Sequence, residues 1–223
     1  GKHVVTANKG PIAWAFDQLK KEADEKKLGF FYETTVMDGT PVFNLVEHTL
    51  KLCKVTAVSG ILNSTTNFIL EGLAAGTDYD LIMEEGRRLG FVEADPTMDT
   101  HGYDAAAKVT ALLNVLMDAK ITPEDVERKG IEDITIEDIN AAEARGKVIK
   151  LLCQGRLENG KVVASVNPVE VDKQDMMASI DSTTSVVSIT TDLMGKISVI
   201  EHAPEIQQTA YGVFGDVLRV LEV

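Results

Sequence analysis

Residues 147–171 read Lys-Val-Ile-Lys-Leu-Leu-Cys-Gln-Gly-Arg-Leu-Glu-Asn-Gly-Lys-Val-Val-Ala-Ser-Val-Asn-Pro-Val-Glu-Val. Apolar and β-branched residues dominate both halves of this stretch, and Asn159-Gly160 lies between them. Asn-Gly favours the tight turn of a two-residue β-hairpin because both positions tolerate a positive φ. The stretch therefore predicts a long antiparallel hairpin, with strands over residues 147–157 and 161–171.

Helical and strand patterns surround this hairpin. Apolar residues recur at helical spacing over residues 12–27, 42–52, 65–74, 80–89, 103–118, 135–144 and 206–220. Further strands are expected over residues 3–6, 30–36, 54–62, 186–191 and 196–201. Residues 91–102 show no period and are expected to form a loop. The sum predicts an α+β fold, in which helices cover one face of an open mixed sheet.

Composition excludes several classes of partner. The 35 acidic and 22 basic residues give a formal net charge of −13, whereas nucleic-acid binding requires a basic surface. No apolar run is long enough for a transmembrane helix, and the N-terminus lacks the zones of a signal peptide. We therefore expect a cytoplasmic protein that binds neither nucleic acid nor membrane. Because Gly1 leads directly into a strand pattern, we also expect a fragment of a longer chain.

Chemistry-bearing residues are densest over residues 90–108, Gly-Phe-Val-Glu-Ala-Asp-Pro-Thr-Met-Asp-Thr-His-Gly-Tyr-Asp-Ala-Ala-Ala-Lys. The stretch holds the carboxylates of Glu93, Asp95, Asp99 and Asp104, followed by Lys108. A spacing of four places Asp104 and Lys108 on one face of the predicted helix. Asp104 also lies in the first turn, where the helix dipole favours a negative charge.

Two interpretations of this pair compete. An isolated Asp-Lys pair on a helix is usually a surface ion pair that contributes about 0.3–0.5 kcal/mol. Here three alanines separate the two residues, which leaves room for a ligand, and further acids precede the helix. Carboxylates could hold a substrate ammonium group while the lysine exchanges a proton with an alcohol or a carbonyl. The context favours this second interpretation.

Three segments resemble homoserine dehydrogenases. Residues 90–108 are similar to the signature of that family in Gly90 to Pro96 and in Asp99, Gly102, Asp104 and Lys108. Residues 1–11 resemble the end of the family's nucleotide-binding domain, and residues 60–70 resemble a strand-to-helix junction. The segments occur in the family's order, and the second half of the chain matches more loosely.

The resemblance implies NAD- or NADP-dependent interconversion of L-homoserine and L-aspartate 4-semialdehyde, in threonine and methionine biosynthesis. It makes Lys108 the general acid and base at the substrate oxygen. Asp104 orients Lys108 and helps to bind the substrate, Glu93 holds the substrate ammonium group, and Asp99 is a further substrate contact.

The same resemblance implies how the chain is organised. Residues 1–28 are the remnant strand and helix of a Rossmann-type nucleotide-binding domain, and residues 29–223 form the substrate-binding, catalytic and dimerisation domain. Lys9 lies between the cofactor and the reacting oxygen, and Gly90 allows the cofactor to approach closely. The partners implied are a small-molecule substrate and a second copy of the chain, as a homodimer.

A monovalent cation, sodium or potassium, is also implied. The family holds it through main-chain carbonyls at the positions of Glu33, Val36, Asp38 and Thr40. Here Met37-Asp38 replaces the usual glycine-rich stretch.

Other departures concern the cofactor. A glycine-rich turn expected before the last helix is replaced by residues 201–207, Glu-His-Ala-Pro-Glu-Ile-Gln, and no Gly-x-Gly-x-x-Gly occurs in the chain. The sequence thus lacks the pyrophosphate loop, and we expect this chain alone to be inactive.

Two alternatives remain. The chain could be a non-enzymatic homoserine-binding or assembly module that has lost redox activity, which the altered turn favours slightly. A related semialdehyde dehydrogenase would need a cysteine nucleophile, and Cys53 and Cys153 lie within apolar patterns that make them poor candidates.

Overall fold

A six-stranded mixed sheet carries most of the chain. The computed structural model describes residues 1–222, and its large sheet has the strand order β4-β6-β5-β3-β7-β8. β4 runs parallel to β6, and every other neighbouring pair is antiparallel. The strands are β3 (Val55–Ile61), β4 (Glu127–Arg128), β5 (Lys147–Glu158), β6 (Lys161–Asp172), β7 (Ser185–Thr191) and β8 (Gly195–Glu201).

The predicted hairpin is confirmed. β5 and β6 pair without interruption from Lys147 opposite Asp172 to Glu158 opposite Lys161. Asn159 has a φ of 50° and Gly160 a φ of 79°, so both turn residues adopt the left-handed conformation that a type I′ turn requires. The hairpin thereby sets the antiparallel character of the sheet.

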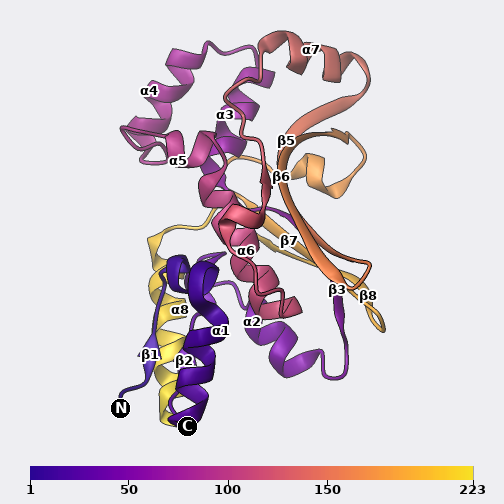
Figure 1. The fold of residues 1–223 in the computed structure, drawn as a ribbon. Helices are drawn as coiled ribbons and strands as arrows, with labels where there is room; N and C mark the ends of the chain where they lie inside the picture. The colour runs from indigo at the N-terminus through magenta and orange to yellow at the C-terminus, as the bar shows by residue number, and fades with distance from the viewer. Residues whose placement is uncertain (223) are drawn as a thin grey trace.

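Helices cover one face of this sheet, as predicted, and Figure 1 shows α3, α6 and α7 beside its strands. The helices are α1 (Lys9–Glu25), α2 (Val42–Asn44), α3 (Ser64–Ala74), α4 (Tyr79–Leu89), α5 (Thr97–Thr100), α6 (Tyr103–Met117), α7 (Ile136–Ala144) and α8 (Ile206–Arg219). α6 is the centre of the core, because Ala105, Val109, Leu112 and Leu113 have no exposed surface. No helix of the described residues is long and apolar enough to cross a membrane.

A smaller unit lies below the large sheet and holds both chain ends (Figure 1). β1 (Val4–Val5) pairs in parallel with β2 (Phe30–Phe31), and α8 returns from the end of the chain to pack beside β1. α1 packs against α6 and so joins the smaller unit to the core. The division of the chain at residue 28 remains a prediction.

The prediction of a strand over residues 30–36 is wrong beyond Phe31. Glu33–Thr35 form a 3-10 turn, η1. Hydrogen bonds of Glu33 explain this turn. Its carboxylate accepts from the backbone N–H groups of Phe43 and Asn44, both at 2.8 Å. Its own backbone N–H donates to the Asp216 carboxylate at 3.0 Å. These contacts turn the backbone away from β1.

Two further predictions need correction. The helix expected over residues 42–52 is a short α2 followed by a π-helical turn, Leu45–Thr49. The loop expected over residues 91–102 contains α5, which begins after Asp95 accepts the Thr97 N–H at 3.0 Å. Asp95 is thus explained by a local turn and not by the acid cluster.

Candidate active site

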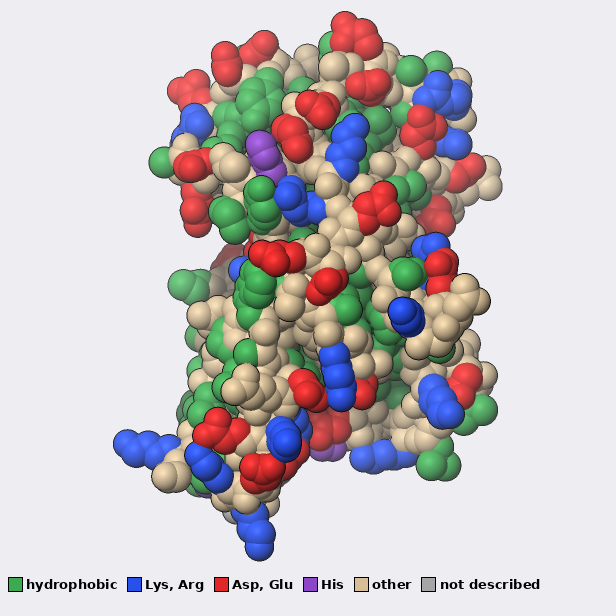
Figure 2. Space-filling model, viewed as in Figure 1, with side chains coloured by type: hydrophobic (Ala, Val, Ile, Leu, Met, Phe, Trp, Pro, Cys, Tyr) green, Lys and Arg blue, Asp and Glu red, His purple; other side chains and the backbone are tan. Residues whose placement is uncertain are grey.

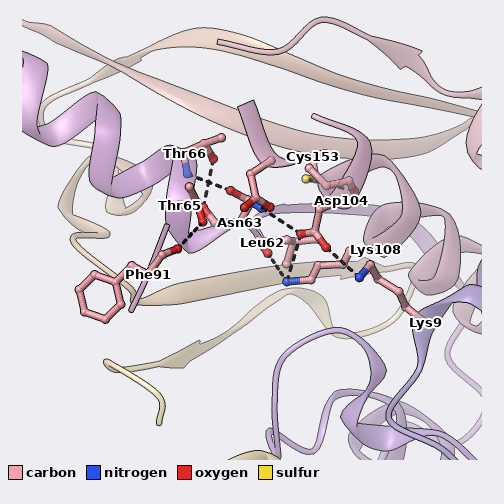
Figure 3. Close-up of polar contacts among 11 residues, drawn as sticks. Lys9, Leu62, Asn63, Thr65, Thr66, Phe91, Asp104, Lys108 and Cys153 are labelled. Carbon is pink, nitrogen blue, oxygen red and sulfur yellow. Dashed lines mark hydrogen bonds and ion pairs between the residues drawn. The ribbon is translucent and has the colours of Figure 1, made fainter. Parts of the chain in front are cut away.

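Asp104, in the first turn of α6, is the centre of a partly buried charged group. Its side chain is only 15% exposed, and Oδ1 lies 2.9 Å from Nζ of Lys9 while Oδ2 lies 3.4 Å from Nζ of Lys108. Figure 3 shows the two amines on one side of the carboxylate. The structure therefore forms the predicted pair Asp104–Lys108 and adds Lys9, which the sequence separates from it by most of the chain's first half.

Local structure explains where the two lysines lie. Lys9 is the first residue of α1, whose N-terminus is capped by the Asn8 side chain accepting the Gly10 N–H at 2.9 Å. Lys108 lies one turn after Asp104, and its Nζ donates to the Leu62 carbonyl at 2.8 Å, at the end of β3. The Lys108 amine is therefore held between a carboxylate and a main-chain oxygen.

Asn63 joins the acids and is a residue whose role the sequence did not reveal. Its Nδ2 donates to Asp99 Oδ1 at 2.7 Å and to Asp104 Oδ2 at 3.0 Å. Its Oδ1 accepts the Thr66 N–H at 2.8 Å and so caps α3. The only signal in the sequence was an asparagine directly before an apolar helix, which predicts a cap but no contact with distant acids.

The charges around Asp104 keep it ionised. Burial alone would raise the pKa of Asp104, but the amines of Lys108 and Lys9 and the amide of Asn63 together lower that pKa to about 2. The carboxylate is thus fully charged at neutral pH. It can hold a cationic amine in place.

Cys153 lies close to the same group, but its thiol is not reactive. It is buried, its Sγ lies 3.8 Å from the Ala105 carbonyl, and burial raises the pKa of the thiol to about 12. A thiol in this state is a poor nucleophile. The geometry therefore argues against an acyl-enzyme mechanism through Cys153.

Glu93 and Gly90 lie on the segment that leads from the end of α4 to α5. Glu93 is exposed, and no hydrogen bond or ion pair within residues 1–222 joins it to Asp104. Gly90 ends α4 with a φ of 81°, and a Cβ atom added there would meet no atom within 4 Å. The Thr65 hydroxyl donates to the Phe91 carbonyl at 2.9 Å, which attaches this segment to α3 (Figure 3).

The predicted cation segment is largely buried. Glu33, Val36 and Thr40 are each at most 9% exposed, and Asp38 accepts a hydrogen bond from the Thr209 hydroxyl at 2.6 Å. Asp38 has a φ of 42°, so it takes the left-handed conformation that a glycine would adopt more readily. The replacement of glycine by Met37-Asp38 has therefore not removed the turn.

Glu201, at the end of β8, is a second group whose place near the site the sequence did not predict. Its Oε2 is buried and has no hydrogen-bond partner in the described part of the chain. Burial raises the pKa of Glu201 to about 7 and the nearby Asp38 carboxylate adds to this rise, while Thr40 and Lys108 oppose it. A carboxylate thus stands where the family resemblance predicted a glycine-rich turn.

A hollow of about 820 Å³ lies elsewhere, between α3, α4 and residues 131–136. Asp104, Lys108 and Lys9 do not line it. Its walls carry Ile69, Tyr79 and His101 among others, and they bring together no comparable group of charges. The candidate active site is therefore the group around Asp104 and not this hollow.

Charged side chains are spread over the whole face of the molecule that Figure 2 shows, with acidic and basic groups interspersed. This face has no continuous basic surface.

Comparisons with known proteins show which family this chain resembles. The family model for homoserine dehydrogenase matches residues 41–218. An NAD(+)-dependent homoserine dehydrogenase from Pseudomonas canavaninivorans is 38% identical over 99% of this chain and 63% of its own length. A homoserine dehydrogenase from Methanocaldococcus jannaschii is 35% identical over 98% of this chain and 64% of its own length.

Solved structures agree. A crystal structure of a homoserine dehydrogenase from Thiobacillus denitrificans superposes with a TM-score of 0.92 at 32% identity, over 99% of this chain and 51% of that one. The chain thus spans between about half and two thirds of the relatives it matches. With the family match covering most of its residues, the chain belongs to the homoserine dehydrogenase family.

Proposed function

We propose that this chain is the catalytic part of a homoserine dehydrogenase, an oxidoreductase that interconverts L-homoserine and L-aspartate 4-semialdehyde with NAD or NADP. The observation that carries the proposal is the partly buried group in which Asp104 lies between Lys9 and Lys108, with Lys108 also hydrogen-bonded to the Leu62 carbonyl. A carboxylate and two amines in such an arrangement suit proton exchange at an alcohol or carbonyl oxygen.

Lys108 is the general acid and base. When bound, the nicotinamide cofactor supplies the hydride chemistry, and the protein supplies position and charge. In the oxidative direction the neutral amine of Lys108 accepts the hydroxyl proton of homoserine, and in the reductive direction the resulting ammonium group returns that proton to the carbonyl oxygen. The charged Asp104 holds the Lys108 amine in position at that oxygen.

Acidic side chains bind the substrate. We assign the substrate ammonium group to Glu93, whose exposed carboxylate is free to receive a cation, and a supporting contact to Asp99, together with Asp104. Asp99 is supported by its bond to Asn63, which holds it beside Asp104.

Lys9 and Gly90 are assigned to the cofactor. Lys9 joins the reacting group from the start of α1, and the open space at Gly90 leaves its backbone accessible to a ring system. The relative from Pseudomonas canavaninivorans is named as NAD(+)-dependent. The choice between NAD and NADP for this protein is left to the assay below.

We further propose that the main-chain oxygens of Glu33, Val36, Asp38 and Thr40 hold a monovalent cation, sodium or potassium. The fit is supported by the burial of this segment and by the unpartnered Glu201 Oε2 near Thr40 and Asp38. A cation there would lie near a buried carboxylate oxygen that has no hydrogen-bond partner in the described residues, and would favour the ionised form of that carboxylate.

The reaction would place the protein in threonine and methionine biosynthesis, as a cytoplasmic homodimer. The acidic composition without a membrane-spanning helix in the described residues is compatible with this setting. Sedimentation analysis of the full-length gene product tests the dimer, which would be contradicted by a monomer at micromolar concentration.

Separate substitutions test the assignment of roles. Lys108→Ala should lower kcat by about 10²- to 10⁴-fold, with little change in homoserine binding. Glu93→Ala should instead raise the KM for homoserine. Lys26→Ala, which removes an exposed lysine from a helical ion pair with Glu22, is the matched control. It should leave kcat and the KM for homoserine unchanged. Wild-type constants in both Lys108→Ala and Glu93→Ala would refute the assignment.

A further inference from the structure

The junction between β3 and α3 contacts several separate segments of the candidate active site. The Leu62 carbonyl accepts from Lys108, the Asn63 amide donates to Asp99 and Asp104, and the Thr65 hydroxyl donates to the Phe91 carbonyl. Figure 3 shows these contacts converging on successive residues of one short stretch. The site is thus assembled from distant segments on a single junction.

The orientation of the Asn63 amide is determined by its own cap. An asparagine side chain has one acceptor oxygen and one NH₂ group with two donors. The oxygen is committed to the Thr66 N–H at 2.8 Å, so the NH₂ group must point the opposite way. Both of its hydrogens are then used, one on Asp99 at 2.7 Å and the other on Asp104 at 3.0 Å.

The two acids need such a donor. Like-charged carboxylates held close together repel each other, and each must be paired or solvated. Asp104 has the two lysine amines, whereas the hydrogen bond from Asn63 is the contact that ties Asp99 to the group. Asn63 is itself only 5% exposed, so water cannot easily replace it.

We propose that Asn63 is a positioning residue, which fixes Asp99 and Asp104 relative to Lys108 and to each other. The inference rests on the proposed function for its catalytic consequence, but the geometric claim stands by itself. Asn63 acts through the two carboxylates and does not touch the reacting atoms. Its loss should therefore lower kcat and, because Asp99 and Asp104 are also assigned to the substrate, raise the KM for homoserine.

Two substitutions at this position separate the cap from the donor. Asn63→Ser keeps a good helix cap but is too short to reach either acid. Asn63→Asp keeps the cap and the shape, but replaces the NH₂ group with a charged oxygen facing two carboxylates. If Asn63 serves only as a cap, both variants should behave as the wild type.

Asn67→Ser is the matched control. Asn67 is equally buried on the same helix, and its amide joins the Ile180 and Ser182 carbonyls and the Lys150 amine, away from the acids. Its substitution should lower the Tm without lowering kcat. It therefore reports what loss of stability alone does to the enzyme.

The kinetic test uses the full-length gene product. We expect kcat to fall by about 10²-fold in Asn63→Ser and at least as much in Asn63→Asp, since small misplacements of catalytic groups have costs of this size. Asn67→Ser should keep kcat within about twofold of the wild type. Equal kcat in Asn63→Ser and Asn67→Ser at equal loss of Tm would overturn the positioning role.

A second measurement does not depend on turnover. Carbon-detected NMR titration of the side-chain carboxyl groups should show one group among residues 63, 99 and 104 of Asn63→Asp titrating above pH 5, because three acids then share the space beside Lys9 and Lys108. If all three titrate below pH 4, the acids are not held together by Asn63 and the inference fails. A wild type without homoserine-dependent turnover would refute the proposed function, while this titration would still decide the role of Asn63.

Discussion

The carboxylate of Asp104 contacts two lysine amines and one asparagine amide. Burial opposes its charge, and the three donors more than compensate, so the folded protein lowers the pKa of Asp104 from its ordinary 3.8 to about 2. A lowered pKa means that the folded state holds the proton less tightly than the unfolded chain. The stabilisation is therefore complete above pH 4 and is lost as the pH falls through the window from about 4 to 2.

This sign gives a stability prediction for Asp104→Asn. The variant should be less stable than the wild type by about 2 kcal/mol at pH 7, from the size of the pKa change. The difference should narrow as the pH falls below 4, because the Asp104 carboxylate then takes up a proton in the unfolded chain more readily than in the folded protein, where its pKa is about 2. Urea unfolding of both proteins at pH 7 and pH 3 measures it.

Asp118→Asn is the control for that experiment. Asp118 is 80% exposed and lies 3.8 Å from Lys120, a surface pair of small expected value. Its substitution should change the free energy of unfolding by less than about 1 kcal/mol at pH 7. If the free energies of unfolding of the wild type and Asp104→Asn differed by the same amount at pH 7 and at pH 3, the neighbours of Asp104 would not lower its pKa as described.

Residue spacing predicted part of this site and could not predict the rest. Asp104 and Lys108 lie four residues apart on one helix, so their contact follows from helical geometry. Asn63 reaches acids that are 36 and 41 residues away in the sequence, and Glu201 nears the site from the end of β8. Such contacts depend on strand order, which no local pattern encodes.

At the scale of elements, α4 shows how a helix end shapes the site. Gly90 ends α4 in the left-handed conformation, and no neighbouring atom restricts the space around it. A side chain at this position would cause backbone strain without a steric clash. The same is true of Gly76, which follows α3 with a φ of 76° and also has open space around it.

Gly90 and Gly76 together permit a matched prediction. Gly90→Ala and Gly76→Ala should each lower the free energy of unfolding by about 1 kcal/mol, the cost of a left-handed non-glycine residue. Only Gly90→Ala should also raise the KM for the nicotinamide cofactor, because only Gly90 is assigned to it. Equal KM values in the two variants would remove Gly90 from the cofactor site.

Helices and hairpins were predicted better than the irregular segments. α6 and the β5–β6 hairpin follow from periodicity and turn chemistry to within a residue or two. The segment after Phe31 has the composition of a strand, but the buried Glu33 carboxylate binds Phe43 and Asn44 and forces a turn. Tertiary contacts of this kind override local propensity.

For the whole molecule, residues 33–44 link its two parts. The segment leads from β2 in the smaller unit toward the large sheet, and it is bonded to α8 through Asp38 with Thr209 and through Glu33 with Asp216. The proposed cation would lie within this link. Its binding should therefore stabilise the protein as a whole.

Thermal unfolding in different salts tests the cation. Sodium or potassium chloride should raise the Tm above that in choline chloride at the same ionic strength. Glu201→Gln, which removes the ionisable carboxylate near the proposed cation, should reduce this difference when it is measured above pH 7, where Glu201 is mostly ionised. A Tm that is the same in all three salts would contradict the cation site, whatever the activity of the enzyme.

The most direct test of the central claim is homoserine-dependent reduction of NAD and of NADP by the full-length gene product, with Lys108→Ala beside the wild type. The claim predicts reduction of at least one nucleotide by the wild type and its loss in Lys108→Ala, with homoserine binding retained in calorimetry. Homoserine binding without reduction of either nucleotide by the wild type would contradict it, and would instead support a binding module that has lost redox activity.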